Sequence, residues 1–137
     1  MVVDALYPKD WLEKPHVDFP EKRNREVCFE ALVRRFADVP KQSLHANISQ
    51  SMAALFHHVS AKRLAQIKAT GVPVLVLTGT DDKFVRPSGS QYLSKELDCP
   101  LLVFEGSGHA LAVEHKYTYC RLLEEIVTKG KHGDYKI

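Results

Sequence analysis

Two acids and a histidine follow two apolar runs of the sequence, each beside glycines. The first run and its loop read VPVLVLTGTDDKFVRP at residues 72–87, and the second reads LLVFEGSGHALAVE at residues 101–114. A carboxylate that accepts the Nδ1 hydrogen of a histidine fixes the tautomer of the ring. It also stabilises the imidazolium that forms when Nε2 takes a proton. Asp81 or Asp82, together with His109, is therefore a candidate acid–base pair.

Such a pair needs two neighbouring strands that run in the same direction. VPVLVL and LLVF are apolar on both alternating faces, which is typical of parallel strands in a covered sheet. The helix expected between them at residues 88–97 gives a β–α–β crossover and an α/β protein. In open sheets of this class, chemistry gathers at the carboxyl ends of the strands. We therefore expect a carboxylate of the first loop, from Asp81 or Asp82, to lie with His109 at one rim of the sheet.

Apolar periodicity predicts helices in most of the remaining chain. The expected ranges are 21–37, 43–58, a segment from a Ser60 cap to Gly71, and 114–128. Prolines at positions 8, 15 and 20 argue against a long helix in the first twenty residues. The buried faces expected for the last two helices are Tyr92, Leu93 and Leu97 in one, and Tyr117, Cys120, Leu123 and Val127 in the other. The chain then divides into a helical segment at 1–70, a β–α–β–α unit at 71–129 and a polar tail at 130–137.

The composition is that of an ordinary globular protein. The chain has 137 residues, of which 45% are hydrophobic and 26% charged, and the length suits one domain. There are 19 basic and 17 acidic side chains, for a formal charge of +2. Basic residues are interleaved with acidic ones, so the sequence predicts no nucleic-acid partner.

Three cysteines, Cys28, Cys99 and Cys120, are widely spaced and include no C-x-x-C. Their odd number and their spacing argue against a disulfide framework or a zinc site, and we expect buried free thiols. No apolar stretch approaches the roughly 20 residues of a membrane span. The N-terminus lacks the pattern of a signal peptide. The sequence therefore predicts no transmembrane segment, and the cytoplasm is the default location.

The two apolar runs and their loops resemble the last two core strands of the α/β-hydrolase superfamily. There the pattern is an apolar strand, G-x-x-D-x-x-V, a helix, a second strand and G-x-G-H. On this match Asp82 corresponds to the acid of the catalytic triad and His109 to its base. The resemblance covers residues 72–128. It implies the C-terminal portion of a hydrolase fold, preceded at residues 1–70 by a helical lid segment.

The activity implied by this resemblance is hydrolysis of a small-molecule ester or lipid-like substrate. In the family a serine, or in some members a cysteine or aspartate, attacks the substrate and forms a covalent intermediate. The resemblance implies neither a metal nor an organic cofactor.

The nucleophile of that family sits on a G-x-S-x-G turn, and this motif is absent. The nearest strings, Ser88-Gly89-Ser90 and Gly106-Ser107-Gly108, lack the spacing. We therefore expect a C-terminal fragment or a truncated hydrolase that supplies acid and base and is inactive alone. The alternative is a non-catalytic binding or regulatory module derived from a hydrolase. An unpaired edge of the first strand also predicts self-association.

Other site chemistries fit less well. Gly106 and Gly108 could begin a dinucleotide fingerprint, but Leu111 occupies the third glycine position. A metal site would have to combine His109 and His115 with the adjacent His57 and His58, which point to different faces of a helix. Four aromatic residues of the first half suit either the core of the lid or the wall of a substrate pocket: Tyr7, Trp11, Phe19 and Phe56.

Overall fold

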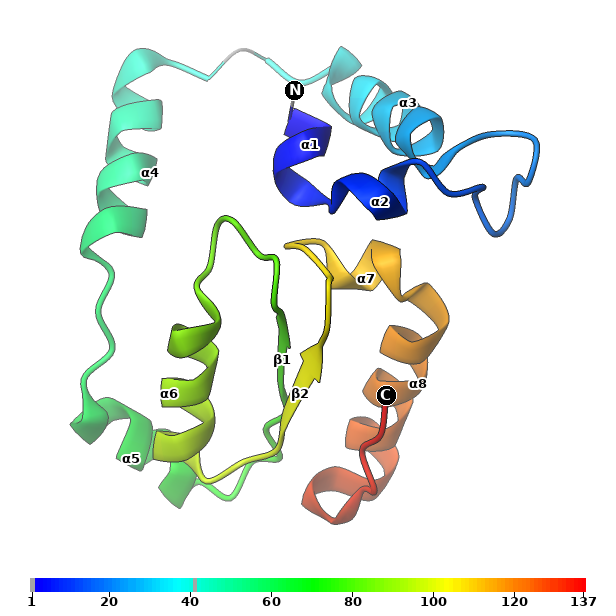
Figure 1. Cartoon of the computed structure of the whole chain (residues 1–137). Coiled ribbons are helices and arrows are strands. Elements are labelled where there is room, and N and C mark those ends of the chain that lie inside the picture. Colours follow the sequence, from blue (N-terminus) through cyan, green and yellow to red (C-terminus); the bar gives the residue numbers. More distant parts are fainter. Residues whose placement is uncertain (1, 41) are drawn as a thin grey trace.

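The computed structural model describes residues 2–40 and 42–137. Its elements, in chain order, are helices around one small sheet (Figure 1). The helices are α1 (Val2–Leu6), α2 (Lys9–Leu12), α3 (Asn24–Ala37), α4 (Leu44–Phe56), α5 (Ala61–Ala69), α6 (Pro87–Leu97), α7 (Leu111–Glu114), α8 (Lys116–Lys129) and the 3₁₀ turn η1 (Gly130–His132). The strands are β1 (Val76–Gly79) and β2 (Leu101–Phe104). Helices predicted at 21–37, 43–58, 60–71 and 88–97 are present with ends shifted by one to three residues.

The two strands pair in parallel, with Val76 opposite Leu101 and Gly79 opposite Phe104. Helix α6 connects them, and α6 and α8 lie on opposite sides of the sheet (Figure 1). This mixture of helices and a parallel sheet is compatible with the α/β class. The first strand begins four residues later than VPVLVL predicted. The ladder starts where the amide of Val76 donates to the carbonyl of Pro100, because β2 offers partners only from that point.

The predicted inward faces of the last two helices are largely wrong. In α6, Tyr92 and Leu93 are 40% and 37% exposed, Leu97 is half-buried, and the residue buried on this helix is the small Ser90. In α8, Leu122 is buried, whereas the predicted stripe of Tyr117, Cys120, Leu123 and Val127 is exposed.

The error in α8 has a local cause. The helix expected at 114–128 is broken at His115, whose φ of −124° and ψ of 41° are not helical. Apolar residues lie on both faces of α8, so their spacing alone does not decide which face is buried. The face that begins at His115 and continues through Tyr119, Leu122 and Ile126 is the one turned inward.

A separate core joins the N-terminal helices. Val3, Tyr7, Leu12 and Cys28 are buried together, and Leu6, Trp11, Leu32 and Ala110 pack against them. Pro8 stands between the two short helices α1 and α2, in keeping with the effect expected of proline. Ala110 belongs to the loop after β2, so this core rests on the rim of the sheet.

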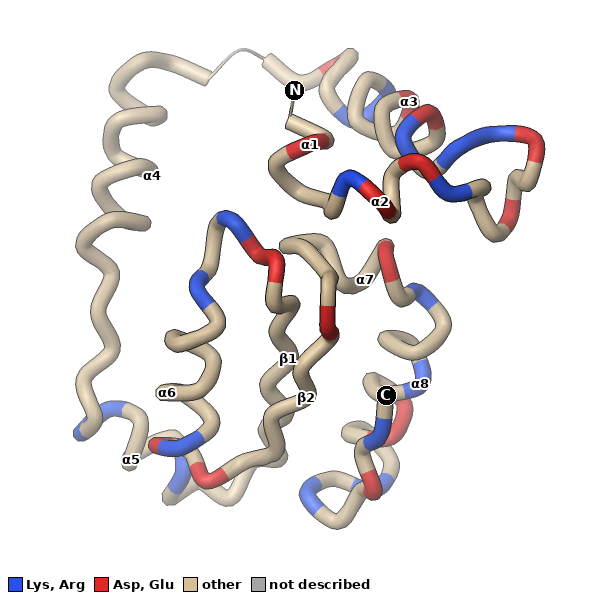
Figure 2. Tube along the Cα trace, in the orientation of Figure 1, with Lys and Arg blue, Asp and Glu red and all other residues tan. Residues whose placement is uncertain are grey.

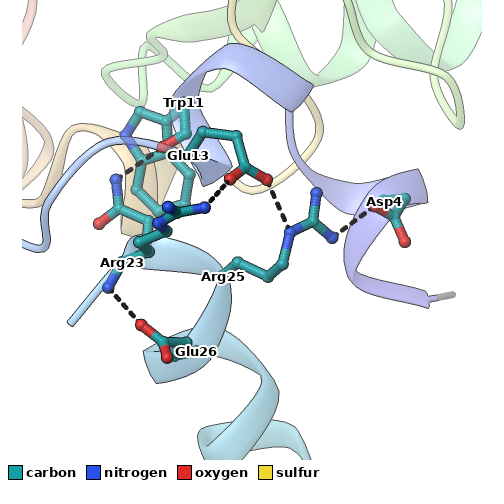
Figure 3. A network of polar contacts seen from close by, with 7 residues as sticks. Asp4, Trp11, Glu13, Arg23, Arg25 and Glu26 are labelled. Carbon is teal, nitrogen blue, oxygen red and sulfur yellow. Dashed lines mark hydrogen bonds and ion pairs between the residues drawn. The ribbon is translucent and has the colours of Figure 1, made fainter.

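Charged side chains tie α3 to α1 and α2 (Figure 3). Arg25 donates from Nη1 to Asp4 Oδ1 at 2.6 Å and from Nε to Glu13 Oε1 at 2.9 Å. Arg23 Nη1 reaches the other oxygen of Glu13 at 2.7 Å, and the amide side chain of Asn24 donates to the carbonyl of Trp11 at 2.8 Å. These contacts fix the three N-terminal helices as one unit.

Helix α4 buries none of its residues. Its apolar stripe of Leu44, Ile48 and Leu55 is exposed, and the helix stands apart from the sheet in Figure 1. The hydroxyl of Ser43 caps it by accepting from the amide of Ala46 at 3.2 Å. Helix α5, in contrast, packs against α6 and buries Leu64.

All three cysteines are free thiols. Cys28 is buried as expected, Cys99 is half-buried and Cys120 is exposed, so the prediction of buried thiols is wrong for Cys120. Cys120 is exposed because α8 buries a different face from the one that the sequence predicted. Within the described residues, no helix has the length and apolar character needed to cross a membrane.

Candidate active site

Asp82 and His109 meet at the carboxyl ends of the two strands. Asp82 lies three residues after β1 and His109 five residues after β2. Nδ1 of His109 is 3.0 Å from Oδ2 of Asp82. The Asp82 side chain is 10% exposed and that of His109 is 39% exposed. Parallel pairing of β1 with β2 thus brings together the two residues that the sequence singled out. Their role in catalysis stays a prediction.

The Asp82 carboxylate is held by its own loop. Its Oδ1 accepts the amide hydrogens of Phe84 at 2.8 Å and Val85 at 2.9 Å, while Oδ2 faces His109. Burial alone would raise the pKa of Asp82. The hydrogen bonds from Val85, His109 and Phe84 outweigh burial and hold the pKa of this carboxyl below its usual range. Asp82 is therefore an ionised acceptor at neutral pH.

Two contacts besides the one to Asp82 hold His109 in place. Its backbone amide donates to the carbonyl of Leu6 at 2.9 Å, and the ring of Phe84 lies 5.1 Å away between centroids. An ionised carboxylate can only accept, so Nδ1 of His109 must carry the shared hydrogen. In the neutral ring Nε2 then has a free lone pair, which is the form required of a general base.

Two glycines allow the loops to approach this closely. A Cβ on Gly79 would lie 2.3 Å from the carbonyl oxygen of Ser107, and one on Gly108 would lie 2.6 Å from that of Leu6. The amide of Asp81 donates to the Ser107 carbonyl at 2.9 Å, which ties the first loop to the second. The glycines of the two loops thus lie where one backbone segment packs directly against another.

Ser107 makes a contact that sequence reasoning missed. Its Oγ lies 2.6 Å from Nε2 of His115, and Ser107 is only 3% exposed. The ring of Phe104 lies 4.7 Å from that of His115 between centroids, tilted by 41°, and burial lowers the pKa of His115. The contact depends on the helix break at His115, for which the apolar periodicity gave no signal. Ser107 is therefore engaged and enclosed, and is not offered to a substrate.

The side chain of Glu114 is hydrogen-bonded to the loop that carries His109. Its Oε1 accepts the amide hydrogen of Gly108 at 2.9 Å. Burial raises the pKa of Glu114, and the charges of Asp81 and Asp82 add to the effect, although the Gly108 amide opposes it. Glu114 ends α7 and does not begin the final helix. Figure 2 shows acidic positions gathered where β1, β2 and α7 end.

His109 also lines a cavity that includes residues of β1, α7 and α8. This shallow cavity of about 380 Å³ is lined by Leu75, Leu77, Tyr119 and the segment from His109 to Ala112. In the part of the chain that the structure describes, β1 pairs only with β2. Among the same residues, the only side-chain hydrogen bond of His109 is the one to Asp82. No serine or cysteine of residues 2–40 and 42–137 is therefore hydrogen-bonded to His109 Nε2.

The other predicted site residues are scattered. Among the described residues, no three histidine, cysteine, aspartate or glutamate side chains are grouped to hold a metal ion. Tyr7 and Trp11 stack at 5.1 Å in the N-terminal core, whereas Phe19 and Phe56 are exposed.

Comparisons of the chain with family models, curated proteins and solved structures give no match. The hydrolase interpretation therefore depends on the chain's own residues and geometry.

Proposed function

We propose that Asp82 and His109 are the acid and base of an α/β-hydrolase-type site for small ester or lipid-like substrates. The observation that carries the proposal is the 3.0 Å contact between His109 Nδ1 and Asp82 Oδ2 at the ends of two parallel strands. It is supported by the cavity that His109 lines, where a nucleophile and substrate have room to approach.

In the proposed reaction, a hydroxyl supplied by another segment lies at Nε2 of His109. The histidine takes its proton as the oxygen attacks the ester carbonyl, and Asp82 stabilises the imidazolium. The proton then passes to the leaving alcohol, which departs and leaves an acyl group on the nucleophile. Water, activated by the same nitrogen, releases the acid. The unpaired edge of β1 is where that segment, or a second copy of the chain, would add a strand.

The isolated chain should show base catalysis without covalent capture. We expect purified protein to resist labelling by a fluorophosphonate probe. Without a nucleophile the chain should lack enzymatic turnover, but base catalysis by His109 should leave a weak hydrolysis of p-nitrophenyl acetate. This residual rate should be lower in His109→Ala, and Asp82→Asn should fall towards that variant. His57→Ala removes an exposed histidine and serves as the control. Fluorophosphonate labelling would show that a nucleophile is already present, and equal hydrolysis by all four proteins would remove the pair from the chemistry.

A non-catalytic binding module is the second candidate. The buried and occupied hydroxyl of Ser107 favours it, because this serine is the one nearest to His109 in the sequence and is not available to attack. In that case no variant changes ester hydrolysis. Asp82→Ala and His109→Ala would then alter only the affinity for a ligand at the His109 cavity.

A further inference from the structure

A second and larger cavity lies between the loop that follows α2 and the segment that runs from α7 into α8. Its volume is about 600 Å³, within the range of small-molecule pockets. The loop that follows α2 forms one wall, and the start of α8 forms the other. Trp11, Phe19 and Tyr117 give it aromatic surface, and Val17, Val27 and Val113 add aliphatic surface. Neither Asp82 nor His109 lines it, so it is distinct from the acid–base pair.

The outer wall of this cavity is tied in place. Asp18 accepts hydrogen bonds from Lys116 Nζ and from the Tyr117 hydroxyl, each at 2.8 Å. The base of the same loop is closed where the amide of Asn24 donates to the carbonyl of Lys14 at 2.9 Å. The cavity is thus formed without a ligand, which lowers the entropy that binding would cost.

Glu114 gives the cavity its specific chemistry. Its carboxyl group is half-buried at the inner wall, and Oε1 is held by the Gly108 amide. Among the described residues, Oε2 has no hydrogen-bond partner and no lysine or arginine forms an ion pair with the group. Lys14 and Lys116 also line the cavity, and Lys116 is paired with Asp18. The carboxylates of Asp81 and Asp82, which have the same sign as ionised Glu114, add to the rise in its pKa.

We propose that this cavity binds a small molecule that carries a protonated amine on an aromatic or apolar body. The amine would donate to the open oxygen of Glu114 and would offset the negative charge of the three carboxylates. Such charge-assisted hydrogen bonds are stronger than neutral ones. The apolar body would lie against Trp11, Phe19 and Tyr117, whose faces also favour a cation. This inference does not depend on the proposed hydrolase role.

Benzylamine, which is protonated at neutral pH, is the probe. Trp11 is the only tryptophan of the chain, so its fluorescence reports on the cavity wall directly. We expect a saturable change in Trp11 emission with benzylamine, at concentrations up to about 10 mM. Benzyl alcohol, which has the same body without the charge, should bind about tenfold more weakly or worse. The absence of saturation with benzylamine, or equal binding of the two probes, would overturn the proposal.

A matched pair of variants tests the role of Glu114. Glu114→Gln keeps an acceptor for the Gly108 amide but removes the charge, and we expect benzylamine to bind about tenfold more weakly or worse. Glu124→Gln removes an exposed charge from α8 and should keep wild-type affinity. In labelled wild-type protein the amide resonance of Gly108 should shift with benzylamine, which reports binding without any variant. Unchanged affinity in Glu114→Gln, or a Gly108 resonance that does not move, would overturn the proposal.

Discussion

Asp82 shares its two carboxylate oxygens between its own loop and His109. Oδ1 accepts the amides of Phe84 and Val85, and Oδ2 lies 3.0 Å from Nδ1 of the histidine. The residue that would orient a catalytic base is therefore also the residue that shapes the loop after β1. Changes at Asp82 should affect stability as well as any chemistry.

We expect Asp82→Ala to lower the free energy of unfolding by about 1–3 kcal/mol, because two amides and one imidazole lose their acceptor. Urea denaturation followed by circular dichroism measures the change. The neighbouring Asp81→Ala is the control. Its side chain is exposed and makes only a 3.4 Å contact with Thr80, so a change within about 0.5 kcal/mol is expected. Equal losses in the two variants would contradict the role given to Asp82.

The contribution of Asp82 to stability should depend on pH in one direction. Its pKa in the folded protein lies below the usual value of 3.8, so the folded state binds fewer protons than the unfolded state in that interval. The contribution is fully present above that value and is lost as pH falls through the lowered pKa. Wild type should therefore lose more stability on acidification than Asp82→Asn. Parallel pH profiles of the two proteins would argue against the ion pair.

Glu114 should show the opposite dependence. Its pKa in the folded protein is raised above the usual 4.5, so the folded state keeps the proton longer than the unfolded state. The stability gained from the protonated form is present below that value and is lost as pH rises through the raised pKa. Glu114→Gln should become more stable relative to wild type as pH increases. Thermal unfolding across the acid range measures this, and Glu124→Gln controls for loss of a surface charge.

Gly79→Ala should disrupt the rim. Its Cβ would lie 2.3 Å from the carbonyl oxygen of Ser107 and 2.6 Å from that of Gly108. Overpacking against backbone costs about 1–3 kcal/mol or more, which urea denaturation would detect. Gly89→Ala, inside α6, meets nothing within 4 Å and should be neutral or stabilising by up to about 1 kcal/mol. A neutral Gly79→Ala would mean that the two loops are not in contact.

Adjacent leucines of α8 offer a test of the helix's orientation. Leu122 is 1% exposed and Leu123 is 48% exposed. Leu122→Ala should cost about 2–5 kcal/mol, whereas Leu123→Ala should change stability far less. Both free energies come from the same denaturation experiment. The reverse order would restore the buried face that the apolar spacing predicted.

The sequence predicted the fold best where one signal had no rival. LLVF became a strand with the expected limits, because its partner, its loop and its flanking helices all constrain it. The rim positions of Asp82 and His109 followed from strand direction alone. In α8 the apolar residues lie on two faces, so the buried face is decided by the break at His115. That break depends on contacts with Ser107 and Phe104 that no local pattern encodes.

Glu114 was the main omission from the predicted site. The sequence predicts only that Glu114 begins the helix at 114–128, a position where an acid commonly favours the helix dipole. Its actual surroundings combine the Gly108 amide with residues of α2 and α3, such as Trp11 and Val27, that are about ninety to a hundred positions distant in the chain. Apolar periodicity and motif spacing carry no information about such a junction.

The bond from the His109 amide to the Leu6 carbonyl joins segments that are more than a hundred residues apart. Contacts of such long range tend to slow folding, because the entropy of closing the loop is lost before the contact can stabilise the fold. The entropy of closing the loop grows only slowly with its length, so its final stability need not suffer. We therefore expect the imidazole to reach its place beside Asp82 only when the first helices dock against the loop after β2.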